Sequence, residues 1–368
     1  MSFYIARNRH PKSALNLFRH GHTGPSRLRL KKKDQKQDPT LCKDNPYIFH
    51  PRVRTVEPVQ QVLRNTKSVI NVGLPSVVLS GVDDFSFGNI LPQIKHCVVS
   101  SSTCEDGQNV KSAQRSKGVI MNVVKAVWSF ADRYPGLLRQ TISYKPYLKA
   151  SWSRFGYNFQ VSGRTGLLFS SELALPNFAP SIEISKTIGM SCEDKDELIS
   201  PIFELSQNVS RKGFDSGFYS DVFPHPQTLI ITEPNWKLPH LVAQGIMFSF
   251  GQLIQNAVCK GVALFGNSLP NPVSIRCIVY NDQKMALLCY QLNTLDFDSD
   301  EGIKNQVWLS PEFPICFTEG VAVQSKNLPD KNTETLKFPE NEFKELVALL
   351  LYGQGLCDNV ELQQSSVI

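Results

Sequence analysis

The chain has 368 residues, of which 41% are hydrophobic and 10% aromatic, so it can bury a sizeable core and is not a disordered protein. Its longest apolar runs, such as Leu346 to Tyr352, are far shorter than the roughly 20 residues of a membrane helix, and no membrane span is expected. The net charge of +6 is concentrated at one end. The first 33 residues hold nine of the 39 basic residues and no acid, which leaves 30 basic against 33 acidic residues in the rest of the chain.

Residues 1–44 are therefore predicted to form a basic N-terminal arm. An acid-free, Arg-rich N-terminus is typical of a mitochondrial presequence, and also of an extended arm that displaces counterions from a nucleic-acid backbone. A solvated tail without a function is the third alternative. The segment RLRLKKK suits phosphate contact, and the residues predicted to bind RNA are Arg27, Arg29, Lys31, Lys32 and Lys33, with Arg52 and Arg54 extending the track.

The first half of the chain mixes helical and strand-like patterns. Residues 55–73 place apolar side chains at helical spacing, with Thr55 positioned to cap the helix and Gly73 to end it. The polar, Ser-rich residues 100–117 predict a surface loop, and a second helix is expected from about 118 to 134. In residues 147–171, short aromatic runs broken by glycines predict a meander of strands.

The second half has clearer patterns. Residues 227–233 are typical of a buried strand, and residues 240–265 predict a helix that packs on more than one side, because Lys260 is its only fully charged residue. Residues 273–293 predict a β-hairpin that turns at Asn281 and Asp282. Residues 340–352 predict an amphipathic helix. Without a regular βαβ repeat, the expected class is α+β or mixed-sheet α/β, in a single large globular domain over residues 45–353, followed by a polar C-terminal tail at 354–368.

An acidic run follows the predicted hairpin: Asp296, Asp298, Asp300 and Glu301. A calcium loop of the EF-hand type needs a Gly at its sixth position and a Glu at its twelfth. Counting from Asp296, the sixth position is Glu301 and the twelfth is Val307, so the spacing favours a solvated acidic turn.

Catalytic and metal signatures are not found in the sequence. It contains no phosphate-binding loop, no G-x-S-x-G elbow, no H-E-x-x-H and no dinucleotide fingerprint. His96, Cys97 and Cys104 come nearest to a zinc set but lack a fourth ligand, and Cys277 and Cys289 are predicted to fill the core. We therefore expect no catalytic residue, metal, cofactor or small-molecule substrate. A matrix enzyme that combines His225 or His240 with a carboxylate at 296–301 is kept as an alternative.

Two stretches resemble a known family. They are YIFHPRVRTVEPVQQVLRNTKSVINVGLPSVVLSGVDD, from Tyr47 to Asp84, and YQLNTLDFDSDEGIKNQVWLS, from Tyr290 to Ser310. Residues 134–163 and 224–233 lie between them in the same order as in the family. The chain resembles the mitochondrion-specific large-subunit ribosomal proteins numbered thirty-seven. The start of the second stretch is shared with a paralogous mitoribosomal protein, numbered thirty in the older small-subunit scheme.

The resemblance implies a structural constituent of the mitochondrial large ribosomal subunit, without cofactor or catalytic residues. Its implied partners are mitochondrial rRNA and other large-subunit proteins, notably the paralogous sibling. Sheet edges and the apolar face of the helix from Phe343 to Leu351 are the expected protein contacts, with core burial of that face as the alternative. The acidic run then shapes an interface and faces solvent or a basic protein neighbour. A free RNA-binding assembly factor remains a further alternative.

Overall fold

The computed structural model describes residues 46–55, 57–82, 84–102, 112–190, 225–259, 266, 268–281, 283–315 and 338–355. The whole predicted arm at 1–44, with its five cations at 27–33, lies outside these ranges, as does the C-terminal tail beyond residue 355. Within the described ranges, no helix combines the length and the apolar character that crossing a membrane requires.

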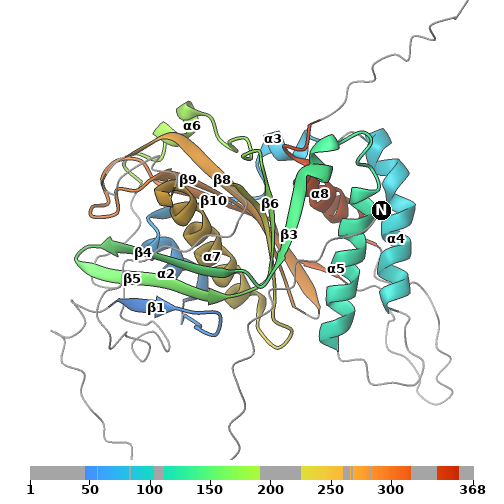
Figure 1. The fold of residues 1–368 in the computed structure, drawn as a ribbon, viewed down its shortest axis with the longest axis horizontal. Helices are drawn as coiled ribbons and strands as arrows, with labels where there is room; N and C mark the ends of the chain where they lie inside the picture. Colours follow the sequence, from blue (N-terminus) through green and yellow to red (C-terminus); the bar gives the residue numbers. More distant parts are fainter. Residues whose placement is uncertain are drawn as a thin grey trace, which may run out of the picture. The chain divides into compact units, whose positions relative to one another are not determined.

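A large mixed sheet forms the centre of this part of the chain (Figure 1). Its strands run in the order β2-β10-β9-β8-β7-β6-β3, and β11 also pairs with β9. β2 is parallel to β10 and β7 to β8, while the other neighbours are antiparallel. The bounds are β2 (Ser68–Val72), β3 (Gln140–Tyr144), β6 (Leu167–Ser171), β7 (His225–Thr232), β8 (Ser268–Tyr280), β9 (Lys284–Thr294), β10 (Asn305–Leu309) and β11 (Phe313–Pro314).

A second, smaller sheet is made of β1 (Tyr47–Phe49), β5 (Tyr157–Arg164) and β4 (Tyr147–Arg154), in that order. β4 and β5 form a hairpin whose turn residues, Phe155 and Gly156, both have positive φ, as a tight hairpin turn requires. The antiparallel pair β3–β6 belongs to the large sheet and continues directly into the pair β4–β5. These four strands thus form one long ribbon that bends from one sheet into the other (Figure 1).

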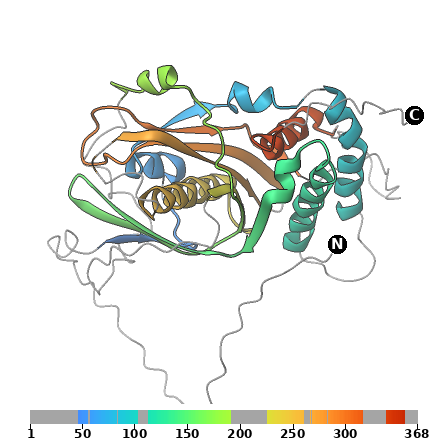
Figure 2. The ribbon, with the colours of Figure 1, turned by 45° about the horizontal axis from the view of Figure 1, so that its top comes forward.

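Helices cover both faces of the large sheet (Figure 2). α7 lies between the two sheets and contacts β7, β8 and β9 on one side and β4 and β5 on the other. α4, α5 and α8 contact one another, and their side chains pack in a second apolar cluster with the opposite face of the large sheet. The bounds are α2 (Pro58–Asn65), α3 (Ser76–Leu79), α4 (Asp84–Ser102), α5 (Ser112–Trp128), the 3-10 helix η1 (Pro135–Arg139), α6 (Ser181–Ser185), α7 (Leu238–Cys259) and α8 (Glu340–Leu351).

The mixed-sheet α+β class is confirmed, and so are its most regular elements. β8 and β9 form the predicted hairpin, and β7 is the buried strand. The meander expected over 147–171 is only partly correct, because β4 and β5 form a hairpin while β6 pairs with β3 and β7 in the large sheet. α7 is buried on every side from Leu241 to Ala257, as its scarcity of charge predicted. The apolar face of α8 lies in the core, where Phe343 and Leu346 are fully buried, so this face is not available to a partner.

Four expectations along the chain are wrong. The helix expected over 55–73 ends at Asn65, and Ile70 lies in β2, because this segment, rich in β-branched residues, pairs with β10. Thr55 does not cap this helix; Glu57 holds the N-cap position, and the Thr55 hydroxyl donates to the Pro58 carbonyl. The loop expected over 100–117 is partly helical, since α4 continues to Ser102 and α5 begins at Ser112. α5 correspondingly ends at Trp128 instead of 134.

Candidate nucleic-acid interface

Three buried cations hold the acidic segment between β9 and β10. Lys67, Arg154 and Lys304 are fully buried. The Lys67 ammonium donates to the Asp296 carbonyl at 2.8 Å and lies 3.4 Å from its carboxylate. The Arg154 guanidinium pairs with the Asp300 carboxylate and donates to the Phe297 carbonyl at 3.1 Å, and Lys304 donates to the main-chain carbonyls of Asp300 and Gly302.

Asp296 and Asp300 therefore neutralise cations of their own chain. Both side chains stay partly exposed to solvent, at 37% for Asp296 and 26% for Asp300, but the basic groups that they face belong to their own chain. Contact with a basic protein neighbour stays a prediction for the exposed Asp298 and Glu301. Burial lowers the pKa of Lys67, and the carboxylate of Asp296 offsets part of that effect. Because ammonium and guanidinium groups already occupy the inward side of this segment, a calcium ion would be repelled there.

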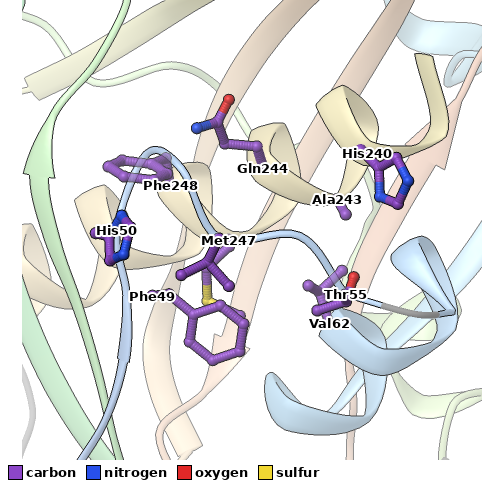
Figure 3. Close-up of a pocket in the computed structure, with 10 residues that line it drawn as sticks. Phe49, His50, Thr55, Val62, His240, Ala243, Gln244, Met247 and Phe248 are labelled. Atoms are coloured by element: carbon purple, nitrogen blue, oxygen red, sulfur yellow. The ribbon is translucent and has the colours of Figure 1, made fainter. Parts of the chain in front are cut away.

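One histidine of the enzyme alternative, His240, lines a cavity without a carboxylate. It lies in the first turn of α7, the cavity has a volume of about 20 Å³ with His50 at its other end (Figure 3), and no carboxylate is among the described lining residues. Its Nδ1 is buried without a hydrogen-bond partner, and burial, together with Arg54 and Lys237, lowers its pKa. His225 lies elsewhere, in β7 opposite Ser171. The described lining of the His240 cavity therefore includes no acid of the 296–301 segment.

Cys277 and Cys289 behave as core residues. Cys277 and Cys289 are fully buried free thiols, which confirms that they fill the core, and burial raises the pKa of Cys277 to about 12. His96 is exposed and Cys97 is half-buried, while Cys104 lies outside the described residues. Among the described residues no three His, Cys, Asp or Glu side chains are grouped closely enough to hold a metal ion.

A basic groove of about 790 Å³ opens where the long ribbon bends between the sheets. Its described lining carries four exposed cations from three separate segments and one carboxylate, Glu233. The aromatic residues Tyr144 and Trp236 also line it, together with the buried Tyr280. The four cations are Arg52, Arg54, Lys145 and Arg164.

The bend of the ribbon positions Lys145 and Arg164. Lys145 has a φ of +48°, and its N–H donates to the Gly166 carbonyl at 2.9 Å. This hydrogen bond joins the two sides of the ribbon at the bend. The Arg164 guanidinium donates to the Lys145 carbonyl at 3.3 Å. Gly166 has a φ of +60°, and a Cβ there would lie 2.2 Å from the Ile230 carbonyl oxygen, so only glycine lets the bend approach β7 this closely.

Two further segments complete the groove. The segment with Arg52 and Arg54 is fixed to α7 by Gln244, whose side-chain amide donates to the Pro51 carbonyl at 2.7 Å. Next to it, Glu233 to Trp236 form a turn with Pro234 at its second position, closed by the Trp236 N–H donating to the Glu233 carbonyl at 3.1 Å. The Arg54 guanidinium lies 5.6 Å from the centre of the Trp236 ring, so these two segments meet at one wall of the groove.

Sequence reasoning found only part of this groove. Arg52 and Arg54 were predicted from local charge, and both lie in the groove. Lys145 and Arg164 were missed, because they are far from Arg52 in the chain and come together only through the bent ribbon. The sequence does carry a sign of the bend. Lys145-Pro146 separates β3 from β4, and Arg164-Thr165-Gly166 separates β5 from β6 at the matching point of the ribbon.

Comparison with known proteins identifies the family. The large ribosomal subunit protein mL37 of Rattus norvegicus is 30% identical over 329 residues, which cover 85% of this chain and 77% of that protein. The chain belongs to the mL37 family. The mL37 protein of Mus musculus is also 30% identical, over 85% of this chain and 77% of its own length. For mL37 of Gallus gallus the identity is 29%, with 83% and 74% covered. No protein-family model matches the chain.

Membership of the mL37 family confirms the resemblance that was read from the two stretches at Tyr47 to Asp84 and Tyr290 to Ser310. Both stretches contain strands of this mL37-family fold together with the segments that connect them. The first contains β1, α2, β2 and the Arg52–Arg54 wall of the groove. The second contains the end of β9, the acidic segment and β10.

Proposed function

We propose that this protein is a structural constituent of the large subunit of the mitochondrial ribosome and that it supports mitochondrial translation without catalysing a reaction. The observation that carries the proposal is the relation to mL37 proteins over 77% of their length at 30% identity. The lack of a carboxylate in the described lining of the His240 cavity agrees with a non-enzymatic role.

Its partners on this proposal are ribosomal RNA and other proteins of the large subunit. The basic residues at 27–33 contact RNA phosphates if residues 1–44 remain on the mature protein, and they act as an import signal if that segment is removed. Arg52 and Arg54 contact phosphates in either case. Such contacts fix the position of the protein on RNA and carry little base preference.

Protein neighbours are expected at the two edges of the large sheet. β2 ends one edge and β3 the other, and both present apolar side chains to solvent: Val72 is 94% exposed, and Ile70 and Ile142 are also exposed. An exposed edge strand with apolar side chains is suited to pair with another protein. The paralogous sibling is the neighbour that we propose for one of these edges.

Density-gradient sedimentation of a mitochondrial lysate tests this function. A tagged copy of the full chain should move with the large-subunit rRNA, and release of intact subunits from whole ribosomes should leave it on the large one. A copy that stays at the top of the gradient would overturn the proposal. A copy found only with incomplete particles would instead support the assembly-factor alternative.

A further inference from the structure

We propose that the basic groove binds a single-stranded segment of RNA, with phosphates against Arg52, Lys145 and Arg164 and one base stacked on the ring of Tyr144. The inference rests on the proposed function for its choice of RNA as the ligand. It adds a defined site, built by the fold, to the RNA contacts expected from the charge of the arm.

The charge of the groove is the first support. Where this chain buries the cations Lys67 and Arg154, it pairs each with a carboxylate of its own. Among the described residues, no carboxylate forms an ion pair with Arg52, Lys145 or Arg164, although all three line one concave surface. Several cations that share a groove raise the local positive potential and attract an anionic chain.

The groove is also built on fixed backbone. The ribbon bend is tied by the hydrogen bond from Lys145 to Gly166, and the opposite wall by the bond from Gln244 to Pro51. The Arg164 guanidinium is oriented by its bond to the Lys145 carbonyl. Since these anchors exist before a ligand arrives, little conformational entropy is lost when phosphates bind.

The aromatic residue indicates a single strand. Tyr144 is 63% exposed at the end of β3, and the Lys145 ammonium lies 5.6 Å from the centre of its ring. In a duplex the bases are already stacked and paired, whereas single-stranded RNA can place a base on an aromatic ring. The volume of about 790 Å³ lies within the range of roughly 300–1,000 Å³ that is common for ligand pockets. An acidic protein segment would use the cations but would gain less from the ring.

The test compares two full-length variants with the same change in net charge. The groove variant carries Arg52→Gln, Lys145→Gln and Arg164→Gln. The control carries Lys125→Gln, Arg139→Gln and Lys186→Gln, which are exposed on α5, η1 and α6 and line no part of the groove. Binding of a fluorescent oligouridylate is measured by anisotropy over a series of salt concentrations, after circular dichroism has shown that both variants fold.

For the groove variant, the slope of log affinity against log salt should be shallower than that of the parent chain by about 2, since each lost phosphate contact contributes about 0.7. The control should keep the parent slope, because its three substituted cations lie outside the groove. Tyr144→Ala should weaken binding by roughly tenfold without changing the slope, and Tyr144→Phe should restore it. Equal slopes for the groove and control variants would overturn the inference.

Two other outcomes are decisive. If polyglutamate binds the parent chain and loses affinity in the groove variant while oligouridylate does not, the groove is a site for an acidic protein and the RNA inference is wrong. The proposed function is judged separately, because the groove variant and the control can both be followed on the gradient. A parent chain that sediments with the large subunit, combined with equal slopes, would remove only the groove inference.

Discussion

The guanidinium of Arg154 forms an ion pair with the carboxylate of Asp300, although 146 positions separate the two residues in the chain. Arg154 ends β4 in the small sheet, while Asp300 lies in the segment between β9 and β10 of the large sheet. Because Arg154 is fully buried and Asp300 is 26% exposed, the pair joins the two sheets at the boundary between core and solvent.

Replacing Asp300 should therefore destabilise the fold. Asp300→Asn leaves the buried Arg154 without its counter-charge, and the free energy of unfolding should fall by about 3 kcal/mol, at the lower end of what such losses cost because solvent reaches Asp300. Asp298→Asn, at an exposed position in the same segment, should change it by less than about 0.5 kcal/mol. Urea denaturation measures both, and equal midpoints would refute a structural role for the ion pair.

Arg276 should be as important to the C-terminal helix. It is fully buried in β8, and its Nη1 donates to the carbonyls of Leu349, Leu350 and Tyr352 at the end of α8. Burial lowers its pKa to about 10, so it stays charged at neutral pH. Arg276→Met should cost roughly 2 kcal/mol or more, since it leaves carbonyls unsatisfied. In this variant, amide hydrogen exchange should become faster in the last turn of α8 than in α7. Unchanged protection in the last turn of α8 would contradict this role.

The bend of the ribbon offers a matched pair of glycine substitutions. Gly166 and Gly156 both have positive φ, but a Cβ would collide with the Ile230 carbonyl only at Gly166 and would meet open space at Gly156. Gly156→Ala should cost about 1 kcal/mol from backbone strain alone. Gly166→Ala should cost clearly more, at least about 2 kcal/mol, and should also weaken RNA binding in the groove. Similar denaturation midpoints for the two variants would argue against the close approach at Gly166.

Stability should fall in mild acid because of His240. Its pKa is lowered in the folded chain below the ordinary value of 6.5, so the unfolded chain takes up the proton first. The free energy of unfolding should therefore decrease as the pH falls from neutral through 6.5, as long as the folded histidine stays neutral. His240→Gln should flatten this part of the pH profile. A profile that is as steep in His240→Gln as in the parent chain would exclude His240 as the source.

The elements that could be predicted from sequence are those whose residue pattern fits only one type of secondary structure. α7 and α8 are long and regular, and the β8–β9 hairpin joins two apolar runs through a polar turn. Residues 66–72 were misassigned because a short apolar run fits a strand as well as a helix, and pairing with β10 decides between them. The partner of Asp296 could not be predicted at all, since Lys67 lies 229 positions away and only the fold brings them together.

The N-terminal arm has a prediction of its own. If the mature protein begins soon after Arg19, the five cations at 27–33 are retained, and replacing them by Gln should weaken RNA binding and flatten its salt dependence by up to about 3.5. N-terminal sequencing of the protein from mitochondria decides whether the arm is present. A mature N-terminus beyond Lys33 would mean that the segment acts only in import.

The central claim is that this mL37-family protein is a permanent part of the mitochondrial large subunit. Quantitative mass spectrometry of mature large subunits, purified from actively translating mitochondria and washed in high salt, tests it most directly. The account predicts one copy per subunit, in the same ratio to rRNA as the other integral proteins and unchanged by the wash. Absence from mature subunits, or a yield far below one copy with enrichment in incomplete particles, would contradict it.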